Sequence, residues 1–270
     1  MLTQRALWIG QHALPLFFVM LALLLAASCA GWWALQRTTR LRRHNTRRPA
    51  LVLGQRFALG CAVILAGAGI FAALARQLGA KDVLGRADQA LTDALRVSVP
   101  QTALHLFAAL THLADTATLT GLCIVMAMAL VVLGQRGLAV GWVVAVAGNG
   151  LLNQTLKQVF GRVRPLDPDG SAVASGFSFP SGHSSGSVVA YGMLAYLALR
   201  LLPARWHLPA LVTAVVLAFT VGASRLFLRV HFASDVMAGF ASGATWLALC
   251  ITGIELLRWW RRRLSLPAAL

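Results

Sequence analysis

Long apolar stretches alternate with short polar connections along almost the whole chain. A helix needs about 20 apolar residues to cross the hydrocarbon core of a bilayer, and seven stretches reach or approach that length. They cover residues 13–36, 56–79, 115–134, 138–157, 183–202, 208–226 and 233–257. The pattern therefore predicts an all-α fold, a polytopic transmembrane helix bundle.

The composition supports this interpretation. The chain of 270 residues is 58% hydrophobic and 12% charged, whereas a soluble domain carries about a quarter charged residues. The net charge of +16 could indicate nucleic-acid binding. However, the basic residues form short clusters between the apolar stretches, which favours orientation in a bilayer. We expect contact with membrane lipids and no nucleic-acid partner; the oligomeric state stays open.

The basic connections predict how the chain is oriented. Segment 37–48 holds six arginines, Arg136 and Arg205 fall in later connections on the same side, and the tail holds Arg258, Arg261, Arg262 and Arg263. The positive-inside rule makes this side cytoplasmic and places the amino terminus outside. A cleaved signal peptide in residues 1–30 is the alternative, but it would export the arginine-rich segment. Together with the alanine-, leucine- and arginine-rich composition, this predicts a bacterial inner (plasma) membrane protein.

On the outer side, residues 86–113 mix acids, polar residues and leucines, which predicts an amphipathic helix along the membrane surface. Basic residues also end two apolar stretches here, and histidines begin two others. Charges at that depth are costly and usually functional. The residues concerned are Lys157, Arg162, Arg164, His183, Arg225, Arg229 and His231. We therefore expect one site at the outer ends of four helices.

Two of the clusters suit an anion. Lys157 and Arg164 are two helical turns apart and could share a face, although snorkelling cations at a helix end are the alternative. Ser181 and Gly182 precede an apolar helix, whose first N–H groups and partial positive charge favour phosphate. Gly182 would let a ligand approach the backbone. Ser181 could also be an ordinary N-cap.

The third cluster contains a histidine with an acid one turn away. His231 and Asp235 are four residues apart at a helix start, so they face the same way. An acid in that position can fix the tautomer of the histidine and raise its basicity, but a helix-capping pair is the alternative. Cations, backbone donors, two histidines and one acid are the groups that phosphoryl transfer needs. No carboxylate cluster or zinc spacing occurs, which predicts a mechanism without metal or cofactor.

The three clusters also match sequence signatures. Residues 157–165 match K-x6-R-P, residues 180–183 match P-S-G-H, and residues 224–235 match S-R-x5-H-x3-D. The chain thus resembles the type 2 phosphatidic acid phosphatase family, which shares its site with vanadium haloperoxidases. The resemblance covers residues 53–257 and implies a six-helix phosphatase core; the first span, 13–36, is predicted as one extra N-terminal transmembrane helix, about which the resemblance says nothing. The expected organisation is an N-terminal transmembrane helix with a basic cytoplasmic loop (1–52), the membrane phosphatase core (53–257) and a basic cytoplasmic tail (258–270).

The resemblance also implies roles. His231 would attack phosphorus and form a phosphohistidine, Asp235 would hold His231, and His183 would protonate the leaving oxygen and later activate water. The phosphate oxygens would be held by Lys157, Arg164, Ser181, Gly182 and Arg225. We interpret His105, His112 and Asp115 as interfacial residues, and Arg162 and Arg229 as possible ligands of a second phosphate.

These roles predict an integral membrane lipid phosphatase with its site on the periplasmic face. Undecaprenyl diphosphate, phosphatidylglycerol phosphate, phosphatidic acid and lipid A are all open as substrates. A lipid phosphotransferase using the same site is the first alternative. A non-enzymatic transporter is the second, and it is disfavoured because the charges gather at helix ends and not at mid-span.

Overall fold

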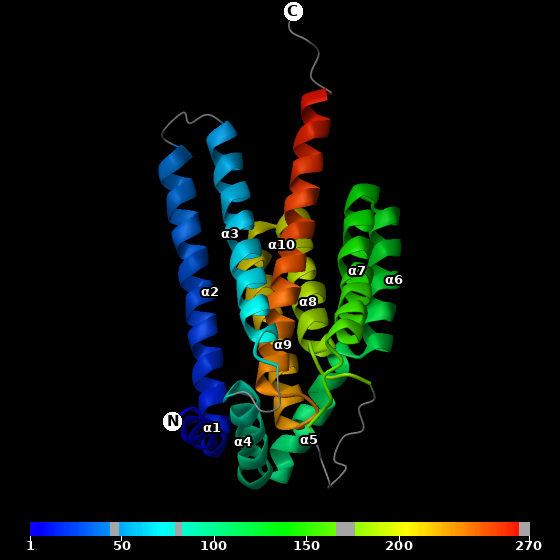
Figure 1. Ribbon diagram of the computed structural model, residues 1–270. Coiled ribbons are helices and arrows are strands. Elements are labelled where there is room, and N and C mark those ends of the chain that lie inside the picture. Colours follow the sequence, from blue (N-terminus) through cyan, green and yellow to red (C-terminus); the bar gives the residue numbers. More distant parts are fainter. Residues whose placement is uncertain (44–48, 79–82, 166–175, 265–270) are drawn as a thin grey trace, which may run out of the picture.

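The computed structural model describes residues 1–43, 49–78, 83–165 and 176–264 (Figure 1). Within these ranges the chain is helical and has no strand, so the predicted all-α fold is confirmed. The helices are α1 (Leu2–Gln11), α2 (Ala13–Arg43), α3 (Pro49–Ala75), α4 (Val83–Ser98), α5 (Gln101–Thr111), α6 (Thr116–Val132), α7 (Arg136–Phe160), α8 (Gly182–Leu201), α9 (His207–Phe227) and α10 (Ala233–Leu264). Short 3-10 turns lie at His112–Ala114 and Ala204–Trp206.

Each of the seven predicted apolar stretches is a helix, but their suitability as membrane spans differs. In the described residues, α2, α3, α9 and α10 are long and apolar enough to cross a membrane. A fifth span results if α5 and α6, which meet at a bend of 42°, count as one. The other two helices, α7 and α8, carry polar side chains that they bury inside the bundle, among them Asn149, Asn153, Ser184 and Ser185. The seven predicted spans are thus seven helices, of which four, in the described part of the chain, are long and apolar enough to cross a membrane by themselves.

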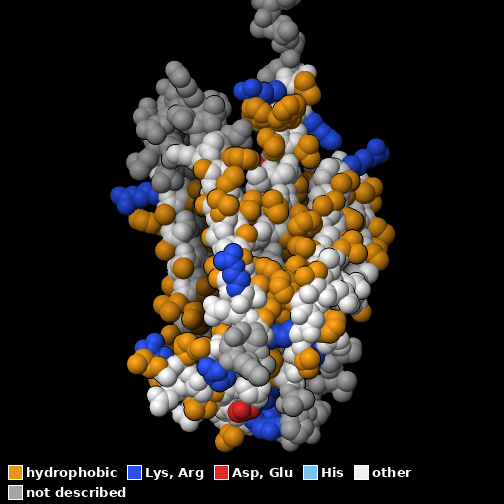
Figure 2. Space-filling model, in the orientation of Figure 1, with side chains coloured by type: hydrophobic (Ala, Val, Ile, Leu, Met, Phe, Trp, Pro, Cys, Tyr) orange, Lys and Arg blue, Asp and Glu red, His pale blue; other side chains and the backbone are white. Residues whose placement is uncertain are grey.

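The flank of the bundle is apolar. Figure 2 shows hydrophobic side chains spread over the visible side between the two ends. Leu65 of α3, Val132 of α6 and Leu151 of α7 are 73%, 86% and 69% exposed. In water, large apolar side chains would not be left uncovered over such an extent, whereas contact with lipid chains suits them.

Three helices form a layer at one end of the bundle, the lower end in Figure 1. The connection predicted as one amphipathic helix is two helices, α4 and α5, because Pro100 lies at the break and cannot donate a helical N–H bond. The third helix, α1, is not predicted by the sequence pattern. It packs closely on α4: Ser98 Oγ donates to Gly10 O at 2.7 Å. A Cβ on Gly10 would lie 2.4 Å from Ala94 Cβ, so this approach requires glycine.

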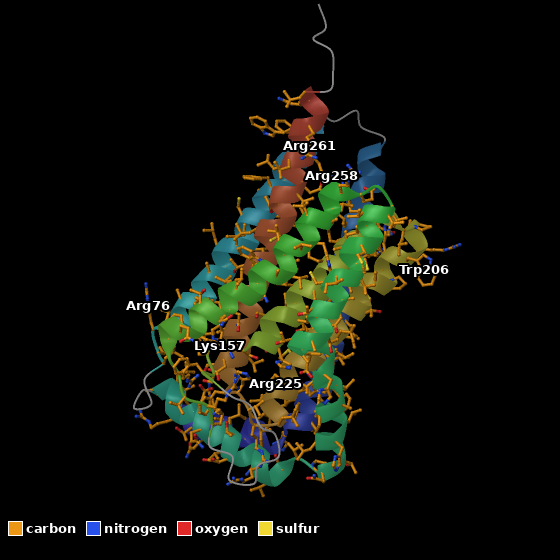
Figure 3. The ribbon with its side chains drawn as sticks, turned by 90° about the vertical axis from the view of Figure 1, so that its right-hand side faces the viewer. Arg76, Lys157, Trp206, Arg225, Arg258 and Arg261 are labelled. Carbon is orange, nitrogen blue, oxygen red and sulfur yellow. The ribbon has the colours of Figure 1, made fainter. Side chains whose placement is uncertain are left out.

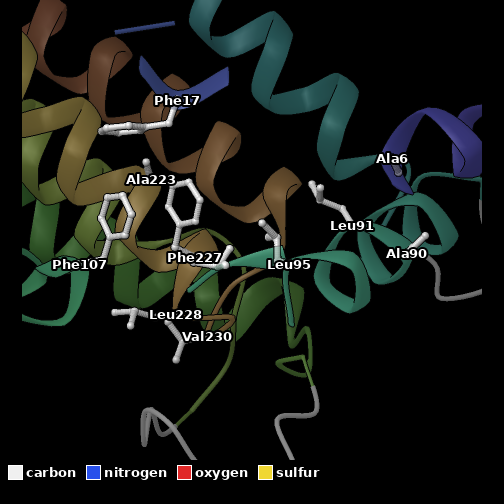
Figure 4. Packing of buried hydrophobic residues seen from close by; sticks show 11 residues of the cluster. Ala6, Phe17, Ala90, Leu91, Leu95, Phe107, Ala223, Phe227, Leu228 and Val230 are labelled. Atoms are coloured by element: carbon white, nitrogen blue, oxygen red, sulfur yellow. The ribbon is translucent and has the colours of Figure 1, made fainter. Parts of the chain in front are cut away.

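Buried aromatic rings tie this layer to the bundle (Figure 4). The rings of Phe107 on α5 and Phe227 on α9 stack with centroids 4.3 Å apart. Phe17 of α2 packs edge-on against Phe107 at 5.4 Å, and Leu95 of α4 belongs to the same cluster. The cluster therefore fixes the C-terminal end of α9, from which one part of the predicted site projects.

The two ends of the bundle carry the connections that the orientation rule predicts. The amino terminus, the C-terminal ends of α3, α7 and α9 and the N-terminal ends of α6, α8 and α10 lie at the lower end, whereas α10 ends at the upper end (Figure 1). Lys157 and Arg225 lie towards the lower end, whereas Trp206, Arg258 and Arg261 lie towards the upper end (Figure 3). This alternation agrees with the prediction. Which end faces the cytoplasm stays a prediction, and the basic loop at 44–48 lies outside the described residues.

Candidate active site

The three clusters predicted from the sequence meet at the lower end of the bundle. The backbone N–H of Ser181 donates to the carbonyl oxygen of Asp235 at 3.0 Å, which joins the second cluster to the third. Arg164 Nη1 lies 3.0 Å from His231 Nε2, which joins the first cluster to the third. His183 lies at the start of α8, where the positive charges of Arg225 and Lys157 act on it. The predicted convergence of the clusters is therefore present in the fold.

A tight turn after α9 brings His231 to this place. Arg229 adopts a left-handed conformation with φ 58, which ends the helix. The N–H groups of Val230 and His231 then donate back to the carbonyl oxygen of Arg225 at 3.2 and 3.3 Å. His231 is 2% exposed and lies between the end of α9 and the start of α10. The turn thus directs the imidazole into the bundle, next to Asp235.

The contacts of His231 determine which ring nitrogen carries its proton. Arginine can only donate hydrogen bonds, so His231 Nε2 must accept from Arg164 Nη1. The proton of the neutral ring then sits on Nδ1, which lies 3.4 Å from Asp235 Oδ2. Burial lowers the pKa of His231 to about 3; the charges of Arg164 and Arg225 act in the same direction and Asp235 opposes them. His231 is therefore neutral near pH 7, and its in-plane electron pair is on Nε2, where it accepts from Arg164.

Asp235 is fully buried, and two donors among the described residues hold its carboxylate. Its Oδ2 accepts the backbone N–H of Phe232 at 3.0 Å, the reciprocal half of a capping box at the start of α10. Its Oδ1 accepts from Arg162 Nη1 at 2.6 Å. Arg162 Nη2 in turn donates to Asp88 Oδ2 at 2.8 Å. The interpretation of Arg162 as a ligand of a second phosphate is therefore wrong, because both ends of its guanidinium group are paired with acids.

Three cations surround the histidine. Arg225 is buried; its Nη1 donates to Thr111 Oγ1 at 2.8 Å, and its Nε–H has no hydrogen-bond partner among the residues that the structure describes. Lys157 lies close enough to Arg164, Asp235 and Arg225 for their charges to act on its ammonium group. Gathered cations repel one another unless an anion lies between them. Of the two nearby acids in the described residues, Asp235 is paired with Arg162. The other, Asp115, bonds to His112 and His183. The arrangement suits a multiply charged anion such as phosphate.

The segment before α8 supplies backbone donors. Ser181 is the N-cap of α8, since its Oγ accepts the N–H of Ser184 at 3.4 Å. The ordinary capping role left open by the sequence is thus present, and it does not occupy the N–H groups of the first turn that face outward from the helix. Asn153 of α7 supports the segment by donating to Pro180 O at 3.4 Å. A Cβ on Gly182 would lie 3.0 Å from Asn153 Oδ1, so glycine fits closely there.

His183 has an acid partner that is distant in the sequence. Asp115 Oδ1 lies 2.9 Å from His183 Nε2, and its Oδ2 lies 2.6 Å from His112 Nδ1. Burial alone would raise the pKa of Asp115, but the hydrogen bonds to His112 and His183 lower it below its ordinary value. Asp115 is therefore ionised near pH 7. The interpretation of Asp115 as only an interfacial residue missed this contact.

Comparison with known proteins places the site in a family. Residues 138–259 match the family model of the PAP2 superfamily, and this segment contains all eight predicted site residues. The segment belongs to the PAP2 superfamily. A stretch of 95 residues is 42% identical to phosphatidylglycerophosphatase B of Bacillus subtilis (strain 168), covering 34% of this chain and 46% of that protein. The chain thus matches less than half the length of this relative.

A solved structure shares a larger part of the fold. The crystal structure described as the first transmembrane PAP2 type phosphatidylglycerolphosphate phosphatase from Bacillus subtilis superposes with a TM-score of 0.67. The superposition covers 72% of this chain and 96% of that chain, at 27% sequence identity. The chain is therefore similar to a transmembrane PAP2 protein over nearly all of the latter, and it is an integral membrane protein.

Three residues of the site that sequence reasoning missed lie outside the matched PAP2 segment. Asp88 on α4, Thr111 on α5 and Asp115 before α6 reach the site from the chain between α3 and α6. One signal could have pointed to the acids: the chain has only eight Asp and Glu residues, so any acid in a connection on the site's side is notable. Arg229, the other residue interpreted as a ligand of a second phosphate, is 7% exposed within the turn after α9, and that role stays a prediction. Two further acids, Asp167 and Asp169, follow Pro165 in the sequence and lie outside the described residues.

Proposed function

We propose that the chain is a PAP2-type membrane phosphatase that hydrolyses a lipid phosphate through a phosphohistidine on His231, with its site on the periplasmic face. The observation that carries the proposal is the surroundings of His231. Its ring is buried and neutral, and its nucleophilic Nε2 lies beside Arg164. Two further cations, Lys157 and Arg225, lie nearby. A nucleophile with its electron pair directed into a cationic pocket is suited to attack a phosphate.

In the first step, the electron pair of His231 Nε2 attacks phosphorus and the bond from phosphorus to the lipid oxygen breaks. His183, in its protonated form, gives a proton to the departing alkoxide. Burial and the charge of Arg225 lower the pKa of His183 to about 4, and Asp115, at 2.9 Å, opposes them. The negative charge of a bound phosphate favours the protonated form further. Asp235, whose Oδ2 lies 3.4 Å from His231 Nδ1, orients the ring by its charge and offsets the positive charge that the ring acquires. The products of this step are the lipid alcohol and phosphohistidine.

In the second step, neutral His183 takes a proton from water, and the resulting hydroxide attacks phosphorus. The bond from phosphorus to Nε2 breaks and its electron pair returns to His231. Inorganic phosphate leaves, and His183 has regained the proton that it gave up in the first step. In both steps the cations and the backbone N–H groups at Gly182 hold the equatorial phosphate oxygens, where charge accumulates.

The substrate is proposed from the two relatives. Both carry names that denote a phosphatase of phosphatidylglycerol phosphate. This lipid is a phosphate monoester, and its head group could reach the lower end of the bundle while its acyl chains stay beside the apolar flank. Undecaprenyl diphosphate, phosphatidic acid and lipid A are further candidates from the sequence. A phosphotransferase differs only in the acceptor, a lipid hydroxyl in place of water.

The test is phosphate release by the purified protein from a panel of these four lipids, with His231→Ala as the control. Phosphatidylglycerol phosphate should release inorganic phosphate with wild type and not with His231→Ala. Adding a hydroxyl-bearing lipid to a radiolabelled donor separates the alternatives, because a phosphotransferase would move the label to the lipid. Phosphate release that is absent with every substrate, or equal in the two proteins, would refute the proposal.

Within the described residues, no group of three or more histidine, cysteine, aspartate or glutamate side chains could hold a metal ion. Positive charge at the phosphate is therefore assigned to Lys157, Arg164 and Arg225. Independence from added metal stays a prediction, which the chelator experiment below tests.

A further inference from the structure

Asp88 connects the surface helix α4 with the buried part of the site. It is 4% exposed, although it belongs to a helix at the end of the bundle. Its Oδ1 accepts the backbone N–H of Ser234 at 3.2 Å, and its Oδ2 accepts from the hydroxyl of Ser234 and from Arg162 Nη2. Ser234 lies in the first turn of α10, directly before Asp235. Asp88 thus contacts both the backbone and the cation that hold Asp235.

Arg162 lies between two acids. Its Nη2 is 2.8 Å from Asp88 Oδ2 and its Nη1 is 2.6 Å from Asp235 Oδ1. The guanidinium group also stacks over the ring of Phe232, with its Cζ 4.4 Å from the ring centroid. The side chain is 10% exposed, so solvent screens these charges weakly. The contacts run in one chain of interactions from Asp88 through Arg162 and Asp235 to His231.

The charge balance of this chain matters for His231. Arg162 and Asp235 alone form a neutral ion pair, and such a pair offers His231 little negative charge. Asp88 adds a second carboxylate on the far side of Arg162, so the three groups together carry one net negative charge. Coulomb interactions are stronger in a buried setting than in water. The additional negative charge therefore stabilises the imidazole of His231, which becomes positive when it bonds to phosphorus.

We propose that Asp88 is a positioning residue for the reaction: by sharing Arg162 with Asp235, it leaves Asp235 free to hold and stabilise His231 during phosphoryl transfer. The inference rests on the proposed function. It assigns a role to α4, which lies outside the PAP2 segment, and makes this surface helix part of the site. It also explains why an acid is buried on α4, since an unpaired buried carboxylate is costly.

The alternative is that Asp88 only caps α10. A double-variant cycle separates the two roles, because it asks whether the effect of Asp88 depends on the charge of Arg162. The cycle comprises wild type, Asp88→Asn, Arg162→Gln and the double variant. The matched control is Asp93→Asn on the same helix, whose Oδ1 accepts from Gln89 at 2.8 Å on the exposed side. Each protein is purified in detergent, and kcat and KM for phosphatidylglycerol phosphate are measured beside a thermal unfolding curve.

Asp88→Asn should lower kcat about 10- to 100-fold, the range for losing a hydrogen bond to a charged group, with little change in KM. Asp93→Asn should retain the kcat of wild type. In the Arg162→Gln background, Asp88→Asn should cause no further loss, because the cation that Asp88 offsets is gone. The comparison of Arg162→Gln with the double variant remains a test even if Asp88→Asn alone does not fold.

Unchanged kcat in Asp88→Asn would overturn the inference. So would a loss from Asp88→Asn that is as large with Gln at position 162 as with Arg162, because that is the behaviour of a cap. A wild-type protein without phosphate release dependent on His231 would instead refute the proposed function, and this inference with it.

Discussion

Asp115 offers a test of how His183 works, because its carboxylate is hydrogen-bonded to His183. Asp115→Asn keeps the size of the side chain and removes its charge. The bond from Asp115 Oδ1 to His183 Nε2 is 2.9 Å long. A hydrogen bond to a charged group contributes about 1.5–3 kcal/mol. The Asp115 side chain is 39% exposed, so solvent screens it and the lower value, about 1.5 kcal/mol, applies. This corresponds to about a tenfold loss of rate.

The loss should depend on the leaving group. A lipid alkoxide needs a proton from His183, whereas p-nitrophenolate leaves without one. Asp115→Asn should therefore lower kcat about tenfold with the lipid monoester, and phosphoenzyme formation from p-nitrophenyl phosphate should change far less. His112→Gln is the control, since it removes the exposed partner of Asp115 and leaves the bond to His183. Equal losses for both substrates in single-turnover measurements would refute the reasoning.

Three further predictions concern the histidine roles, metal and membrane orientation. With p-nitrophenyl phosphate, His183→Ala should accumulate phosphoenzyme, because the water of the second step lacks its base; unchanged breakdown would remove His183 from that step. Activity should survive EDTA, and orthovanadate should inhibit as a mimic of the five-coordinate transition state; loss with EDTA and rescue by magnesium would contradict this. In intact cells lacking the native cysteines, an impermeant thiol reagent should label Val97→Cys and not Ala204→Cys, and the reverse would invert the orientation.

The helices of the bundle were predictable because a membrane span must satisfy its backbone hydrogen bonds within itself, which requires a long apolar stretch. The stretch 138–157, for example, lies within α7, at Arg136–Phe160. The short helix α1 was not predictable in this way, since its stability comes from packing on α4 at Gly10 and Ala94. The break at Pro100 was visible in the sequence, but the surface segment was still predicted as one helix.

In the candidate site, contacts between residues close in the sequence were likewise predictable, and contacts between distant residues were not. His231 and Asp235 share a helical turn, so their contact follows from local spacing. The contact between His183 and Asp115 spans 68 residues, and the one between Arg162 and Asp88 spans 74. The first depends on how the start of α6 packs against α8, and the second on how α4 packs against the segment after α7. Sequence spacing could not separate a phosphate ligand from an arginine held between acids. Arg162 was therefore misassigned, whereas its neighbour Arg164 contacts His231 and its role as a phosphate ligand stays a prediction.

The central claim is covalent transfer of phosphate to His231. The most direct measurement is to mix purified protein with radiolabelled phosphatidylglycerol phosphate, quench within one turnover, and locate the label by mass spectrometry. We expect an acid-labile, alkali-stable phosphate on His231 that is absent from His231→Ala. Label that persists in His231→Ala, or that is found on His183 in wild type, would contradict it.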